Sequence, residues 1–312
     1  MRDRMRLSRI TSRAAAIAVL AGLLLGCQAA GRTPGAPGGS TAGVDAIKVV
    51  TTTTVFADIV ENVGGARVSV SSIIPPGVGP EDYEPKPDDA RKLTDADLIV
   101  SNGVGLDDFL NRLLASGSGG ETPHLVLGDG IPVLTVDGEA NPHFWLDPTL
   151  VKQHYLPAIA TKLTELDPAG KAAYAANSAS FGAALDALDA ELKARVATIP
   201  AANRKLVTFH DAFPYFARHY GFELVGVVLE NVGQDPGAAD LAALVEKVKA
   251  AHVRAVFSEA QFNPKLSQTL AQEAGITNVV TTLYNDALGP APADTYLGLM
   301  RWNVDQIVMA LQ

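Results

Sequence analysis

The sequence has a single cysteine, Cys27, and therefore no partner for a disulfide within the chain. Any domain that it forms must be stable without a covalent cross-link. The sequence has no other long apolar run after the one from Ala14 to Gly26, so no later segment is expected to cross a bilayer. The HExxH motif and the clustered His-x-His pattern, both typical of zinc hydrolases, are also missing from the sequence.

Positive charge is scarce: 25 Lys and Arg residues stand against 34 Asp and Glu residues, which gives a formal net charge of −9. Hydrophobic residues make up 47% and charged residues 19% of the chain, as is ordinary for a globular protein. An acidic surface argues against nucleic acid as a partner and does not hinder the binding of cations.

Residues 1–26 have the order of a secretory signal peptide. Five arginines within the first 13 residues precede an apolar run that is too short to span a bilayer. The run Leu24-Leu25-Gly26-Cys27 resembles a bacterial lipobox, which implies cleavage before Cys27 and a diacylglyceryl thioether on its sulfur. The alternatives are an uncleaved anchor or a simple signal peptide, but the one cysteine of the chain falls at the lipobox position.

Residues 27–45 are rich in Gly, Pro, Ala, Ser and Thr, a composition that cannot bury a core and that predicts a flexible tether. A lipid with two acyl chains anchors a protein firmly. The sequence therefore predicts an extracytoplasmic lipoprotein, held at the periplasmic face of the membrane or at the cell surface.

The rest of the chain alternates between strand-like and helix-like stretches. Short β-branched or apolar runs predict four strands in each half: Ile47–Thr53, Val68–Ile74, Leu98–Asn102 and His124–Gly128, then Leu206–Phe209, Leu224–Leu229, Ala255–Phe257 and Asn278–Leu283. Helices lie between them, the clearest from Ala238 to Ala251. This pattern predicts an α/β fold of two lobes, residues 46–166 and 200–312, each with a mainly parallel sheet covered by helices.

One long helix is expected between the lobes, over residues 167–199. Asp167 is a candidate N-cap, Pro168 suits the first helical position, and Pro200 ends the helix. Apolar side chains recur along it at helical spacing: Tyr174, Phe181, Leu185, Leu188, Leu192 and Val196. A stiff helical spacer suits a receptor whose lobes move little.

Side chains of metal-binding types follow predicted strands in both halves, where open parallel sheets bind their ligands. Glu81 and His143 follow strands of the first half, and His210 and Asp286 follow strands of the second. Pro142 stiffens the loop at His143, and bulky apolar residues from Phe144 to Leu146 anchor it. A fixed imidazole is what a metal site requires, although a histidine that only packs is the alternative.

These stretches resemble the TroA-like zinc and manganese solute-binding lipoproteins of metal ABC importers. The resemblance rests on the following motifs: Asn141-Pro142-His143 with Trp145-Leu146-Asp147-Pro148, Ala96-Asp97-Leu98-Ile99-Val100 with Asn102-Gly103, and Ser258-Glu259-Ala260-Gln261-Phe262. It implies two α/β lobes joined by one backbone helix, with a metal ion held in the cleft between them. The ligands that it implies are Glu81, His143, His210 and Asp286.

One motif departs from the family pattern. Where the family commonly has Pro-His-x-Tyr-Glu-Pro, this chain has Pro80-Glu81-Asp82-Tyr83-Glu84-Pro85. Glu81 aligns with the family's histidine, but the neighbouring Asp82 or Glu84 could be the ligand instead. All three could also be solvated loop acids.

A set of two imidazoles and two carboxylates suits Mn²⁺, Zn²⁺ or Fe²⁺ and does not suit copper(I). The carboxylates favour Mn²⁺, whereas intrinsic affinity favours Zn²⁺. Glu259 ends a predicted strand and is either a partner of a metal ligand or a surface residue. The remaining histidines, His124, His154, His219 and His252, are expected to be surface or packing residues.

The sequence thus predicts a monomeric, membrane-tethered receptor that captures a divalent metal ion and delivers it to an ABC permease, without catalysing a reaction. Two alternatives belong to other classes. A zinc-dependent hydrolase would need an open metal position and a general base. A cell-surface adhesin, an activity sometimes ascribed to this family, is neither favoured nor excluded by any residue.

Overall fold

The computed structural model describes residues 46–80, 83–136, 138–229 and 236–312. The predicted signal peptide, the tether, Glu81 and Asp82 lie outside the described residues. Within the described ranges, no helix is both long enough and apolar enough to cross a membrane.

The N-terminal lobe is built on a four-stranded parallel sheet in the order β2-β1-β3-β4. Its elements in chain order are β1 (Ile47–Thr51), α1 (Thr54–Gly64), β2 (Val68–Ser72), α2 (Pro87–Thr94), β3 (Leu98–Ser101), α3 (Asp108–Ala115), β4 (His124–Val126), β5 (Thr135–Val136), β6 (Glu139–Ala140), α4 (Pro148–Leu150) and α5 (Leu156–Leu166). The residues of β3 are all buried, as expected of a strand inside a covered parallel sheet.

The C-terminal lobe repeats this plan with two parallel pairs, β7–β8 and β9–β10, and β7 lies against β9. Its elements are β7 (Lys205–Thr208), α7 (Pro214–Tyr220), β8 (Glu223–Val227), α8 (Ala238–Ala250), β9 (Ala255–Glu259), α9 (Lys265–Ala274), β10 (Asn278–Leu283) and α10 (Tyr296–Leu311). The predicted α/β fold of two lobes with parallel sheets is therefore confirmed.

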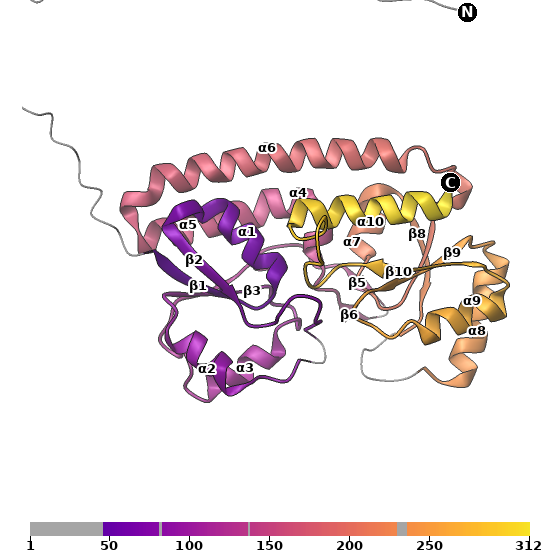
Figure 1. Ribbon diagram of the computed structural model, residues 1–312, viewed down its shortest axis with the longest axis horizontal. Coiled ribbons are helices and arrows are strands. Elements are labelled where there is room, and N and C mark those ends of the chain that lie inside the picture. Colours follow the sequence, from indigo (N-terminus) through magenta and orange to yellow (C-terminus); the bar gives the residue numbers. More distant parts are fainter. Residues whose placement is uncertain (1–45, 81–82, 137, 230–235) are drawn as a thin grey trace, which may run out of the picture. The chain divides into compact units, whose positions relative to one another are not determined.

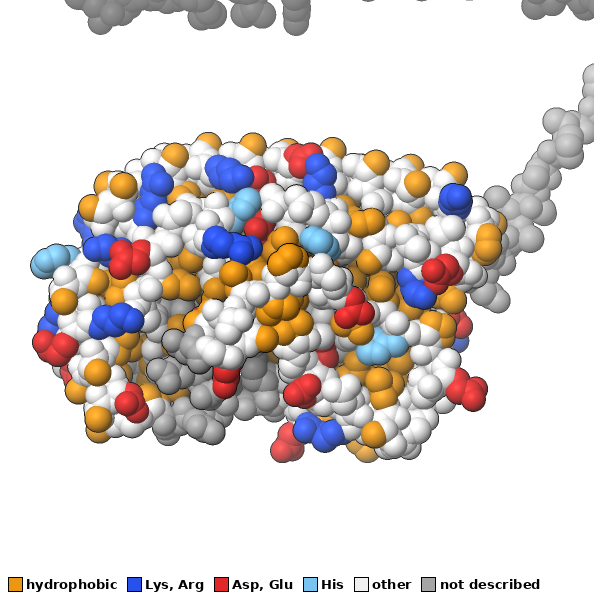
Figure 2. Space-filling view, turned by 180° about the vertical axis from the view of Figure 1, so that it is seen from behind, with side chains coloured by type: hydrophobic (Ala, Val, Ile, Leu, Met, Phe, Trp, Pro, Cys, Tyr) orange, Lys and Arg blue, Asp and Glu red, His pale blue; other side chains and the backbone are white. Residues whose placement is uncertain are grey.

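The long helix between the lobes is α6 (Lys171–Val196), which runs along one side of both of them (Figure 1). Its 26 residues span about 39 Å. The six apolar residues that the sequence placed on one face of this helix are all buried. The opposite face of α6 points outward and forms the upper edge of Figure 2. Small hydrophobic side chains are spaced along this edge, with acidic and basic side chains between them.

The start of this helix differs from the prediction. A short 3₁₀ turn, Pro168–Gly170, precedes α6, and the Asp167 side chain caps neither helix. Its Oδ2 instead accepts hydrogen bonds from Arg67 Nε at 2.6 Å and Tyr174 Oη at 2.7 Å. These bonds hold the pKa of Asp167 at about 2. Asp167 therefore fixes the helix to the N-terminal lobe and does not cap its backbone.

Both ends of α6 are tied to a lobe. Near its start, Asn177 donates to the backbone oxygen of Val63 in α1. Near its end, Glu191 accepts from Arg301 Nε of α10 at 2.9 Å, and α10 packs along the same stretch of α6. The helix therefore acts as a strut that limits how far the lobes can move apart.

Candidate metal centre

Three side chains from the two lobes meet at one point. His143 comes from the N-terminal lobe, and His210 and Asp286 come from loops that follow β7 and β10. One ligand atom from each residue lies within 4.8 Å of the other two. His143 Nε2 is 3.5 Å from Asp286 Oδ1, and His210 Nε2 is 3.7 Å from Asp286 Oδ2. The exposed fractions are only 5%, 4% and 0%, so a small charged ligand would be largely shielded from water here.

Asn141 orients the His143 ring. Its Oδ1 lies 3.1 Å from both the backbone nitrogen and Nδ1 of His143. An Nδ1–H that donates to this oxygen leaves the lone pair of Nε2 directed at Asp286. The amide group of Asn141 also donates to Asp211, at 2.6 Å to the backbone oxygen and 3.0 Å to Oδ2. Asn141 thus links the His143 loop to the residue that follows His210 in the other lobe.

Glu259 stands behind His210. Its Oε1 is 3.3 Å from His210 Nδ1, so the imidazole has a carboxylate on the side away from Asp286. A carboxylate at one ring nitrogen fixes the tautomer and raises the basicity of the other nitrogen. Glu259 is 1% exposed, so the surface role left open by the sequence is wrong. All five residues of β9 are buried, because this strand lies between β7 and β10.

Asp286 is fully buried, and burial raises its pKa, while His210, Gln261 and Asn285 act in the opposite direction. Its Oδ2 accepts a hydrogen bond of 2.7 Å from Gln261 Nε2. Asn285 Nδ2 lies 3.1 Å from His210 Nε2. A buried carboxylate facing two imidazole nitrogens is a site that favours a bound cation.

Aromatic side chains hold the His143 loop against both lobes. Trp145 Nε1 donates to the backbone oxygen of Asn285 at 2.8 Å, and Tyr296 Oη donates to the backbone oxygen of Trp145 at 2.7 Å. Tyr215 Oη donates to the backbone oxygen of Asn141 at 3.1 Å. The anchoring predicted from the apolar run after His143 is therefore present, and it extends to the loop that carries Asp286.

A buried acid lies beneath the same loop. Asp107 Oδ2 accepts from the backbone nitrogens of Asn102 and Gly103 at 2.8 and 2.6 Å. The Asn102 side chain in turn donates to the backbone oxygen of Pro142, next to His143. Burial raises the pKa of Asp107 to about 6.

This raised pKa gives the first prediction. The folded chain binds the Asp107 proton more tightly than the unfolded chain, so stability is lost as the pH rises from about 4 to about 6.5. The loss is on the order of 3 kcal/mol. Asp107→Asn removes the charge, and the unfolding free energy of the metal-free variant should lack this decline. The measurement is denaturant unfolding of both proteins across that pH range. The exposed Asp95→Asn variant should follow the wild type, and a variant at Asp107 that also did so would contradict the assignment.

The other predicted residues lie elsewhere. Glu84 is exposed, and the described cluster does not include it. His219 is a packing residue as expected, with Nε2 2.6 Å from Asp189 Oδ1 and Nδ1 3.3 Å from Asp147 Oδ2. His124 opens β4, and its Nε2 lies 2.7 Å from Ser101 Oγ. His252 lies in the turn after α8, with a positive φ of 52°.

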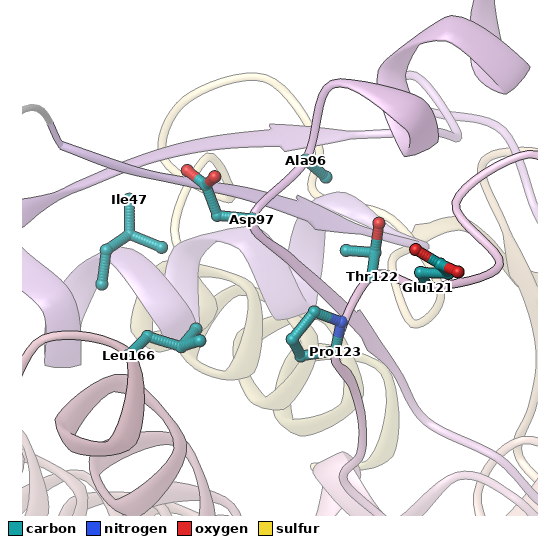
Figure 3. Close-up of a pocket in the computed structure, with 7 residues that line it drawn as sticks. All are labelled: Ile47, Ala96, Asp97, Glu121, Thr122, Pro123 and Leu166. Atoms are coloured by element: carbon teal, nitrogen blue, oxygen red, sulfur yellow. The ribbon is translucent and has the colours of Figure 1, made fainter.

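A surface hollow of about 470 Å³ lies away from this cluster, at the amino ends of β1, β3 and β4 (Figure 3). Asp97 and Glu121 border it, and none of the described residues that line it is a histidine. Because ligand sites of parallel sheets lie beyond the carboxyl ends of the strands, we do not assign the metal site to this hollow.

Three amide side chains that contact the cluster were not predicted from the sequence: Asn141, Gln261 and Asn285. Each is one or two positions from His143, Glu259 or Asp286 along the chain. A short polar residue beside a candidate ligand was the available signal, but which atom it would contact depends on the fold.

Comparison with known proteins agrees with this geometry. Residues 49–310 match the family described as ZnuA, zinc-uptake complex component A, periplasmic. The chain belongs to this family. The family members are substrate-binding proteins of transporters, and the match covers both lobes and every described residue of the cluster.

Relatives differ in the metal that their names give. The manganese-binding lipoprotein MntA of Halalkalibacterium halodurans is 33% identical over 86% of this chain and 89% of its own. The iron-binding protein YfeA of Yersinia pestis is 35% identical over 83% and 85%. The periplasmic zinc-binding protein TroA of Treponema pallidum has a structure that aligns with a TM-score of 0.78 at 30% identity, over 85% of this chain and 99% of its own. Membership of the family therefore does not decide the metal.

Proposed function

We propose that this protein is the extracytoplasmic receptor of a metal ABC importer, which captures a divalent cation and delivers it to a membrane permease. The observation that carries the proposal is the meeting of His143, His210 and Asp286 between the lobes. Family membership and relatives named as lipoproteins of metal transporters support the receptor over a hydrolase or an adhesin. The lipobox at Cys27 supports anchoring to the membrane as a lipoprotein, and we expect the receptor to be a monomer.

The proposed ligands are His143, His210 and Asp286, together with Glu81 from the loop before α2. Two neutral imidazoles and two carboxylates would carry a charge of −2 and neutralise a divalent ion. The ion and these four ligands together would carry no net charge, which lowers the cost of dehydrating the ion. The set suits Mn²⁺, Zn²⁺ and Fe²⁺. With four protein ligands, a tetrahedral ion has no open position for water, so we infer that the protein is not an enzyme.

The test is whether metal stabilises the fold. A ligand that binds only the native state adds about 2.7 kcal/mol to the unfolding free energy when its free concentration is 100 times its Kd. For a domain of this size, that corresponds to a rise in Tm of roughly 5–10 °C. Chelator-treated protein should gain this stability with Mn²⁺ or Zn²⁺ in differential scanning calorimetry.

Mg²⁺ is the matched control, because it prefers oxygen ligands and its own water to imidazole. An equal rise with Mg²⁺ would indicate non-specific charge binding. No rise with any of Mn²⁺, Zn²⁺ and Fe²⁺ would contradict the receptor function.

A further inference from the structure

The turn that follows β9 carries a side chain into the cluster from a fixed backbone. The backbone nitrogen of Ala260 donates to the oxygen of Leu283 at 2.9 Å, and that of Phe262 donates to the oxygen of Glu259 at 3.2 Å. The Phe262 ring stacks on Phe209 with 4.7 Å between ring centroids. These contacts hold the half-buried Gln261 with its amide nitrogen 2.7 Å from Asp286 Oδ2.

This hydrogen bond makes the two oxygens of Asp286 unequal. Oδ1 faces His143 Nε2 and Oδ2 faces His210 Nε2, but only Oδ2 also accepts a hydrogen bond from Gln261. The amide must present its nitrogen, because its oxygen would repel a carboxylate. A donor on Oδ2 occupies one lone pair and draws electron density from that oxygen. Metal binding through Oδ1 alone is therefore favoured over chelation by both oxygens.

The number of oxygens that Asp286 offers bears on the choice of ion. Zn²⁺ is satisfied by four ligands in a tetrahedron, whereas larger and harder ions favour additional oxygen ligands. We propose that Gln261 determines specificity: by holding Oδ2, it restricts Asp286 to one metal bond and shifts the preference of the site from Mn²⁺ towards Zn²⁺. This inference rests on the proposed function.

The test replaces the donor with a side chain of similar length. Gln261→Met removes the hydrogen bond, so Asp286 can chelate, and the ratio of Kd for Mn²⁺ to Kd for Zn²⁺ should fall by about 10-fold, the scale of effects of groups that contact metal ligands. Gln261→Glu keeps the shape but cannot donate to Asp286 when ionised, and it should shift the ratio in the same direction. Gln268→Met, on the exposed side of α9, is the matched control.

Competition titrations give the ratio, and X-ray absorption of the Mn²⁺ and Zn²⁺ complexes gives the number of oxygen neighbours. One additional oxygen in the Gln261→Met complex with Mn²⁺, together with the shifted ratio, would support the proposal. An unchanged ratio would overturn the proposal. If the binding of both ions were weakened equally, Gln261 would only support the structure. Wild-type protein that binds neither ion would instead contradict the proposed function.

Discussion

Asp286→Asn is expected to weaken the binding of Mn²⁺ and Zn²⁺ by more than about 100-fold, beyond the upper end of the effect of partners outside the ligand set. Asp286 is the one anion of the described cluster, and it faces both imidazoles. Its replacement by a neutral amide of nearly the same shape leaves a bound divalent ion with an uncompensated buried charge. Isothermal titration calorimetry with both ions measures the loss.

The stability of the same variant distinguishes lost binding from misfolding. Burial disfavours the ionised form of Asp286 and therefore raises its pKa. Removing that charge should leave the Tm of the metal-free protein equal to or higher than that of the wild type. Asp294→Asn makes the same change at an exposed acid of the same loop and should bind metal normally. Retained binding in Asp286→Asn would exclude Asp286 as a ligand.

Regular patterns in the sequence predicted the fold where local and tertiary preferences agree. The apolar positions of α6 recur at helical spacing over 26 residues, and no competing contact changes which face is buried. Where a distant residue competes, the prediction failed. Arg67 precedes Asp167 by 100 positions, and the bond between them takes the carboxylate that would otherwise cap the helix. The β5–β6 hairpin was missed because two residues per strand are too few to show alternation.

The residue types of the site, and their places after strands, could be predicted from the sequence. The contacts that support these residues could not. His210 and Asp286 follow the parallel strands β7 and β10, where ligands of parallel sheets bind, whereas His143 follows the antiparallel pair β5–β6 of the other lobe. The role of Glu259 depended on whether β9 is covered on both sides, which is a property of strand order. The contacts of Asn141 and Gln261 depend on loop geometry, and residue spacing does not encode it.

Glu81 stands where the resemblance to the TroA-like lipoproteins implies a histidine, and it gives the last prediction. Glu81→Ala should weaken metal binding by at least about 10-fold, and far more than Asp82→Ala or Glu84→Ala. It would remove one of the two carboxylates that we propose neutralise the ion. The loop is anchored on both sides of this position: Pro80 and Tyr83 are buried, and Tyr83 Oη donates to Asp89 Oδ2 at 2.7 Å. The three alanine variants, each titrated with both metals, form a matched set within one loop.

Glu81→His tests the same proposal in the opposite sense. It rebuilds the Pro-His motif that the resemblance implies and would exchange the proposed oxygen ligand for an imidazole, which suits Zn²⁺ better than Mn²⁺. The ratio of the two affinities should therefore move towards Zn²⁺, whereas Glu81→Ala should weaken both ions. If Asp82→Ala removes binding and Glu81→Ala does not, the ligand is the adjacent acid. If neither variant changes the affinity, the site has three protein ligands and an open position, as a hydrolase would require.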